Sequence, residues 1–157
     1  MATWFGSNGA VQVDLASMTV SGGHAAGDVL VGIENLRGTA YADRLTGDGA
    51  ANRIEGQFGD DVILGGAGDD ILLGEGGSDR LTGGAGRDSM RGGTGADHFI
   101  YARILDLSTV QVMIDVIEDF RSAERDLIDL AAIDANPVLA GDQALQFVGT
   151  AGLTAIG

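Results

Sequence analysis

Residues 56–64, GQFGDDVIL, and residues 65–73, GGAGDDILL, share a nine-residue pattern of glycine, aspartate and an apolar residue. The pattern runs without insertion through residues 38–100, which therefore hold seven consecutive nonapeptides. Position 1 is glycine and position 8 is apolar in all seven, while position 6 is aspartate in six and Asn52 in the other. Such a period predicts a repeat architecture, in which each unit packs mainly against its neighbours.

Each part of the nonapeptide has a physical interpretation. Glycines at positions 1, 2 and 4 allow a tight turn with positive φ, although position 4 is Tyr41 and Ala50 in the first two repeats. Positions 7–9 form a very short strand whose middle side chain points inward. One turn and one strand make half a coil, so eighteen residues complete a coil. Successive coils then stack at the strand spacing of about 4.8 Å.

We therefore predict an all-β fold, a right-handed parallel β-roll (β-solenoid). We expect an irregular N-terminal capping coil at residues 1–37, the seven-repeat roll at 38–100, and a small β-rich cap at 101–157. Trp4 and Phe5 are expected to pack on the first coil. Within the cap, residues 115–120 have a strand-like pattern, and a short helix is expected to begin near Asp126 or Asp129.

The eighteen-residue coil stacks the side chains of position 6 in two columns. Carboxylates one strand spacing apart repel each other unless a cation lies between them. Ca²⁺ suits such a place because it takes six to eight oxygen ligands, including backbone carbonyls, whereas Mg²⁺ demands compact octahedral geometry. The predicted cofactor is therefore Ca²⁺. One column contains Asp43, Asp61, Asp79 and Asp97, and the other contains Asn52, Asp70 and Asp88.

The stretch GIENLRG, at residues 32–38, extends this pattern upstream as a degenerate repeat. Glu34 lies eighteen residues before Asn52, and Leu36 falls at position 8. Two interpretations of Glu34 are open, a metal ligand and an ordinary surface residue. Counting pairs that are eighteen residues apart gives a ceiling of about six ions. The candidate ligands are Glu34, Asp43, Asn52, Asp61, Asp70, Asp79, Asp88 and Asp97.

The composition favours cations as partners. The 157 residues include 23 acidic residues against nine arginines and no lysine, a net charge of −14, and 27 are glycine. This charge disfavours nucleic acids and anionic membranes. The absence of cysteine excludes disulfides and thiolate zinc sites. No cleavable signal peptide and no apolar run of transmembrane length is visible, so we expect any export to use a route that does not read the N-terminus.

The seven nonapeptides resemble the RTX (haemolysin-type calcium-binding repeat) family. The resemblance implies an extracellular protein, secreted by type I machinery, that stays unfolded in the low calcium of the cytosol and folds on Ca²⁺ outside. Near the C-terminus, DVIEDF (115–120), DLIDLAAIDAN (126–136) and AGDQALQFVG (140–149) resemble the C-terminal segment of serralysin-type secreted metalloproteases. That segment continues further in the family, which implies a truncated cap here.

No catalytic motif accompanies the repeats. The chain has two histidines but neither a His-Glu-x-x-His motif nor a Gly-x-Ser-x-Gly elbow. We therefore predict no enzyme, but the non-catalytic C-terminal part of a secreted protein with an upstream domain in a longer parent. Two alternatives are open. One is an accessory module of an exoenzyme, such as a serralysin-like protease or an alginate epimerase. The other is a carbohydrate-binding or adhesin module that uses Arg44 and Arg80.

The strands of the roll also carry apolar residues at their outward positions. Val62 and Leu64 face out on one sheet, and Ile71 and Leu73 on the other. Exposed apolar pairs of this kind call for a cover. We expect the segment 101–157 to cover one of the two faces.

Overall fold

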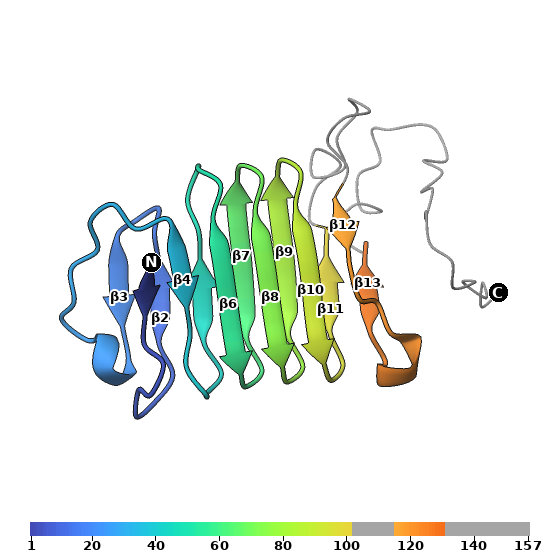
Figure 1. Ribbon diagram of the computed structural model, residues 1–157, viewed down its shortest axis with the longest axis horizontal. Helices are drawn as coiled ribbons and strands as arrows, with labels where there is room; N and C mark the ends of the chain where they lie inside the picture. Colours follow the sequence, from blue (N-terminus) through green and yellow to red (C-terminus); the bar gives the residue numbers. More distant parts are fainter. Residues whose placement is uncertain (102–114, 131–157) are drawn as a thin grey trace.

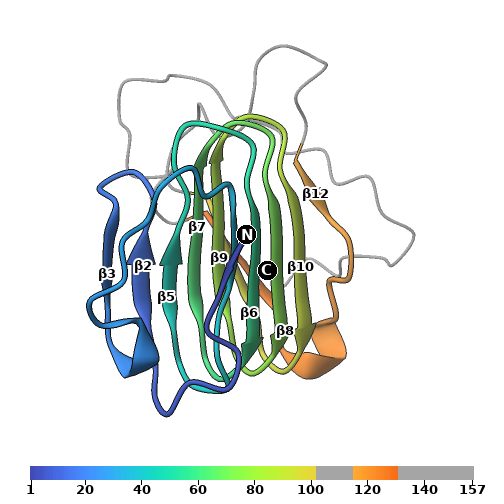
Figure 2. The ribbon, with the colours of Figure 1, turned by 60° about the vertical axis from the view of Figure 1, so that its left-hand side comes forward.

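The computed structural model describes residues 1–101 and 115–130. Two sheets lie face to face along one long axis (Figures 1 and 2). The six-stranded sheet contains, in spatial order, β1 (Ala2–Thr3), β4 (Asn35–Arg37), β6 (Arg53–Phe58), β8 (Ile71–Gly76), β10 (Ser89–Thr94) and β12 (Val116–Ile117). The seven-stranded sheet contains β13 (Leu127–Asp129), β11 (His98–Ile100), β9 (Arg80–Ala85), β7 (Val62–Ala67), β5 (Arg44–Thr46), β2 (Gln12–Asp14) and β3 (Thr19–Ser21).

The helices of the described residues are two single 3₁₀ turns, η1 (Gly23–Ala25) and η3 (Ser122–Glu124). Neither they nor any other described segment forms a helix long and apolar enough to cross a membrane. The all-β class and the predicted β-roll are confirmed.

Strand register confirms the coil of eighteen residues. In the six-stranded sheet β6 pairs in parallel with β8, and Ile54 lies opposite Leu72. In the seven-stranded sheet β7 pairs in parallel with β9, and Ile63 lies opposite Leu81. Consecutive repeats thus alternate between the sheets, and the chain returns above itself after two repeats.

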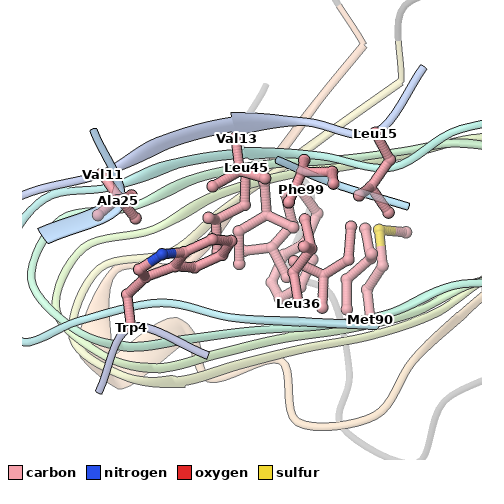
Figure 3. Packing of buried hydrophobic residues seen from close by; sticks show 14 of the residues in the cluster. Trp4, Val11, Val13, Leu15, Ala25, Leu36, Leu45, Met90 and Phe99 are labelled. Atoms are coloured by element: carbon pink, nitrogen blue, oxygen red, sulfur yellow. The ribbon is translucent and has the colours of Figure 1, made fainter. Parts of the chain in front are cut away.

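The apolar residues of position 8 form the core between the sheets. Each of them is fully buried, and they form two facing rows, one from each sheet, which Trp4, Val11 and Val13 of the N-terminal segment join (Figure 3). Because each repeat contributes one such residue, the interior is narrow, and burial of apolar area alone provides little stabilisation per residue. The residues of the two rows are Leu36, Leu45, Ile54, Ile63, Leu72, Leu81, Met90 and Phe99.

The N-terminal segment closes the near end of the roll. Strand β2 pairs in parallel with β5 and antiparallel with β3, so a hairpin finishes the seven-stranded sheet. Trp4 is buried as expected, and its Nε1–H donates a hydrogen bond of 2.9 Å to Asp28. The expectation for Phe5 is wrong: its ring is 64% exposed, under the guanidinium of Arg37 at 5.2 Å.

The described part of the C-terminal segment lengthens the roll. Strand β12 joins β10 and confirms the strand expected at residues 115–120, while β13 joins β11. A helix that begins at Asp126 is wrong, whereas one that begins at Asp129 would lie mostly outside the described residues. Asp126 stands where the aspartate of a repeat would stand, and its Oδ1 accepts the N–H of Asp97 at 3.1 Å, which directs residues 127–129 into the sheet. The rest of 101–157, which was expected to cover a face, lies outside the described residues.

Candidate metal centre

The aspartates of position 6 form two buried ladders at the turns of the roll. In the first column each backbone N–H donates to Oδ1 of the aspartate one coil further on. The distances are 2.7 Å from Asp43 to Asp61, 2.8 Å from Asp61 to Asp79 and 2.9 Å from Asp79 to Asp97. These four side chains are at most 2% exposed. The structure thus brings together the residues that the eighteen-residue spacing placed in one column.

The second column has the same geometry from Asn52 to Asp88. The N–H of Asn52 donates to Oδ1 of Asp70, and that of Asp70 donates to Oδ1 of Asp88, both at 2.9 Å. At the N-terminal end of this column, Nδ2 of Asn52 donates to the backbone carbonyl of Glu34 at 2.9 Å. Glu34 therefore lies one coil below Asn52, as its place in the sequence predicts, but its side chain is exposed. At Glu34 this column therefore contains the backbone carbonyl oxygen and not the side-chain carboxylate.

The glycine at position 1 makes room for each aspartate. A Cβ added at Gly56 would overlap Oδ2 of Asp61, and one added at Gly74 would overlap Oδ2 of Asp79. The carboxylate therefore folds back under the first residue of its own repeat, inside the turn. Position 1 is glycine in every repeat because a side chain there would occupy the place of the carboxylate.

One oxygen of several buried carboxylates has no hydrogen-bond partner. Oδ2 of Asp61, Asp70, Asp79 and Asp97 accepts no hydrogen bond, although each atom is buried. A buried, unsatisfied oxygen costs free energy, the more so when it carries charge. We call the turns at 56–61, 65–70, 74–79 and 92–97, which contain these four residues, the open turns.

The charge of these carboxylates is costly in the absence of a cation. Burial, with a smaller contribution from the neighbouring carboxylates Asp79 and Asp43, raises the pKa of Asp61 to about 8, although the hydrogen bond from the N–H of Asp43 lowers it. Burial likewise raises the pKa of Asp70 and that of Asp79 to about 7. The pKa of Asp97 is raised too, first by burial and then by Asp126 and other acidic neighbours. A cation near these oxygens would reverse this balance.

The first two repeats differ, because their turns are completed by the protein itself. Oδ1 of Asp43 accepts the N–H of Val11 at 2.7 Å, and its Oδ2 accepts the N–H of Thr39 at 2.6 Å. The Thr39 hydroxyl adds a third hydrogen bond, of 3.0 Å, to Asp43. Asn52 is neutral, and its Oδ1 accepts the N–H of Asp48 at 2.8 Å. We call the turns at 38–43 and 47–52 the closed turns.

The donor set of the open turns fits Ca²⁺ only if backbone oxygens take part. Among residues 1–101 and 115–130, no three acidic or histidine side chains lie close enough together to hold a metal ion. The turns do supply carbonyl oxygens at close range: a Cβ at Gly77 would overlap the carbonyl oxygen of Gly59 in the coil below. Carboxylates combined with carbonyls are the ligands that Ca²⁺ accepts, in flexible geometry, at 2.3–2.6 Å in proteins generally.

The sequence interpretation missed two members of the ladders. Oδ1 of Asp115 accepts the N–H of Asp88 at 2.9 Å, and Asp126 does the same for Asp97. They stand 27 and 29 residues after their partners, so a strict period of eighteen does not find them. The signal was present in the motifs DVIE (115–118) and DLID (126–129), which repeat the DVIL of residues 61–64 without the glycines.

Two further carboxylates accept hydrogen bonds from the backbone of the turn at residues 92–97. Asp119 accepts the N–H groups of Gly92 and Gly93, and Glu124 accepts that of Gly95, all at 2.9 Å. The hydrogen bond from Gly95, and to a lesser degree Arg121, lowers the pKa of Glu124. Two carboxylate side chains of the segment 115–130 thus satisfy three backbone N–H groups of this turn.

Comparison with known proteins identifies the repeats. Residues 30–63, 46–81 and 64–99 each match the family described as "RTX calcium-binding nonapeptide repeat (4 copies)". The match covers the position-6 residues from Asp43 to Asp97 and reaches upstream to include Glu34. No curated protein matches the chain.

Proposed function

We propose that this chain, in which residues 30–99 match the RTX calcium-binding nonapeptide repeat family, is a Ca²⁺-dependent folding module of a secreted protein. RTX repeats bind Ca²⁺ and are typical of secreted proteins. The proposed context is the non-catalytic C-terminal part of a longer protein, exported by type I machinery, with a further domain upstream. The resemblance of the C-terminal segment to serralysin-type proteases supports this context.

The unpartnered, buried carboxylate oxygens of the open turns carry the proposal. Asp61 and Asp79 lie in successive coils, and each keeps one oxygen without a donor at a buried position. Since burial and mutual repulsion hold their pKa values near neutrality or above, ionisation opposes folding without a cation. A dication between coils compensates both carboxylates at once, and it links parts of the chain that are eighteen residues apart.

The proposed ligands are the position-6 side chains, together with turn carbonyls. Pairs one coil apart give up to about six sites, of which those formed by open turns alone have the strongest demand for a cation. The lower sites include the closed turns, where protein donors already satisfy Asp43 and Asn52. The proposed set is Glu34, Asp43, Asn52, Asp61, Asp70, Asp79, Asp88 and Asp97.

Folding of the roll is expected to follow the calcium concentration. One core residue per repeat does not offset the entropy of ordering nine residues, which costs about 1–2 kcal/mol each for the backbone alone. Extracellular calcium modules bind with Kd of about 10⁻⁴–10⁻³ M. The repeats would therefore remain unfolded in a low-calcium cytosol, which suits passage through an export channel, and fold outside.

The test is a calcium titration of the whole chain. Far-UV circular dichroism in EGTA should show a largely disordered chain, and millimolar CaCl₂ should restore the β-signal in a cooperative transition. MgCl₂ at the same concentration is the matched control and should restore much less. A chain that is fully ordered in EGTA, or that folds equally well in magnesium, would refute the proposal.

A further inference from the structure

The N-terminal end of the roll has an unpaired strand edge. Strand β3 is the last strand of the seven-stranded sheet and pairs with β2, so no described strand covers its outer edge (Figures 1 and 2). Natural proteins usually protect such edges with charged residues, proline or a bulge, because the free N–H and C=O groups can pair with another chain. The sequence Thr19-Val20-Ser21 has no charge and no proline, its pairing with β2 is regular, and Thr19 and Ser21 are exposed.

Exposed apolar side chains lie at the same end of the roll. The segment between η1 and β4 passes from one sheet to the other, and Leu30 within it is buried in the core. Its neighbours Val29 and Val31 are 85% and 79% exposed, and Met18, which directly precedes β3, is 69% exposed. No other large apolar side chain of residues 1–101 or 115–130 is as exposed as these three. We call residues 18–21 and 29–31 the end face.

The N-terminal segment carries little of the charge of the molecule. Residues 1–37 include three acidic residues and one arginine, whereas the whole chain has a net charge of −14. Two of these carboxylates already have donors: Asp14 accepts the N–H of Ser17, and Asp28 accepts Nε1–H of Trp4, both at 2.9 Å. The first open turn precedes β7, three strands inward from β3. At about 4.8 Å per strand this separation exceeds the Debye length of about 8 Å at physiological salt.

We propose that a second copy of this chain covers the end face, with the two β3 strands paired antiparallel about a two-fold axis. The end face is complementary to itself in this arrangement. Val20 lies opposite the partner's Val20, each Thr19 lies opposite a Ser21, and Val29 and Val31 are removed from water. The same neutral donors, acceptors and apolar side chains are used twice, and the acidic turns of the two copies stay apart. A two-fold interface closes on itself, so assembly ends at the dimer.

The expected dimer is weak and depends on salt. Strand β3 has three residues, so the new ladder is short, and small interfaces of this kind are typical of transient complexes. We expect a dissociation constant of about 10 µM. Because both copies are strongly negative, a higher salt concentration should screen their repulsion and strengthen the dimer. The interface goes beyond the proposed calcium function and requires only that the N-terminal end of the roll is folded.

The test is sedimentation velocity of the whole chain in millimolar calcium, at protein concentrations up to about 100 µM. The parent should sediment with twice the mass of the chain. Val29→Asp places a carboxylate on the end face, and Thr19→Lys gives the edge strand a protecting charge. Both replaced side chains are exposed, so folding should be kept while dimer formation weakens at least tenfold. The matched control is Leu127→Asp, on β13 at the opposite end of the same sheet, which should dimerise like the parent.

Each result supports or overturns the dimer. A dimer that is weakened in Val29→Asp and Thr19→Lys but kept in Leu127→Asp supports it. A parent that is monomeric at the highest concentration overturns it and leaves the end face to a different polypeptide. Open-ended oligomers, or a dimer that both end-face variants leave unchanged, also overturn it, because the contact then lies elsewhere. Circular dichroism of the same samples reports calcium-dependent folding separately, so failure of the dimer and failure of the calcium proposal remain distinguishable.

Discussion

In the closed turns at 38–43 and 47–52, the polar side chain at position 6 has its partners within the protein, whereas in the open turns one oxygen of each aspartate has none. Both kinds of turn lie in the same roll and have the same backbone ladder. They differ in Thr39, whose N–H and hydroxyl reach Asp43, and in Asn52, which carries no charge. The two closed turns also lack the glycine of position 4.

This comparison indicates where the calcium demand lies. Ordinary hydrogen bonds are sufficient to complete a turn when donors are available or when the charge is absent. The open turns keep ionisable oxygens buried without donors, and there the pKa values of Asp61, Asp70 and Asp79 rise to about 7–8. We infer that the N-terminal end of the roll is held by the protein and the middle by cations.

The largest expected effect comes from replacing the aspartate at the centre of the first column. Asp79→Asn keeps an oxygen for the N–H of Asp61 but removes the charge between two open turns. The calcium midpoint of folding should rise by on the order of tenfold or more, because ligand charge tunes the affinity of such sites. The measurement is a calcium titration by circular dichroism.

Asp43→Asn is the matched control from a closed turn. It should lower stability through a lost hydrogen bond, by about 1 kcal/mol, and leave the calcium midpoint almost unchanged. Equal shifts of the midpoint in Asp43→Asn and Asp79→Asn would remove the distinction between closed and open turns.

A glycine pair provides the next contrast. A Cβ at Gly77, in an open turn with φ of 139°, would overlap the carbonyl of Gly59, whereas a Cβ at Gly49, in a closed turn, would meet nothing within 4 Å. Gly77→Ala should therefore cost more than about 1 kcal/mol in urea unfolding at saturating calcium, and Gly49→Ala should be neutral or slightly stabilising. Similar unfolding midpoints for the two variants would show that the coils are not packed this closely.

The open turns should also make the metal-free chain sensitive to pH. Asp61 titrates near 3.8 when unfolded and at about 8 when folded, so the folded chain binds more protons between these values. Stability without calcium should then fall as pH rises from about 4 to 8, and acidification in EGTA should increase the β-signal. The check is circular dichroism in EGTA across this range. An increase of order with rising pH would have the opposite sign and contradict the raised pKa values.

The smallest expected effect is the conversion of a closed turn into an open one. Asn52→Asp places a carboxylate one coil below Asp70 and replaces the donor that reaches the carbonyl of Glu34. Folding should then need a few-fold more calcium, with one more ion bound at saturation, as measured by isothermal titration calorimetry. If the stoichiometry and midpoint match the parent, the neutral side chain at this position has no part in closing the turn.

The period of nine residues was enough to predict the fold, because glycine, aspartate and an apolar residue at fixed places specify turn, ladder and core. It was enough to place Asp61 and Asp79 in one column. It did not reveal that Asp43 is satisfied by Val11 and Thr39, since those contacts join residues 32 and 4 positions apart and depend on how the first coil closes.

The C-terminal continuation was missed for a different reason. Asp115 and Asp126 continue the ladders after an insertion, and Asp119 replaces a glycine turn as a hydrogen-bond acceptor. A search with a fixed period of eighteen residues misses these aspartates. Stacking requires only that the chain returns to the same edge of the roll, and the number of residues between two stacked positions can vary. The helix expected near Asp126 failed because strand pairing with β11 outweighs a local capping signal.

The most direct test is a crystal structure grown in calcium, with anomalous difference density measured along both columns. The account predicts peaks between successive coils at Asp61, Asp70, Asp79 and Asp97, each contacted by the carboxylate oxygen that has no donor. The weakest or absent peaks should lie beside Asp43 and Asn52. A folded roll without density at the open turns, or with these carboxylates directed into solvent, would contradict it.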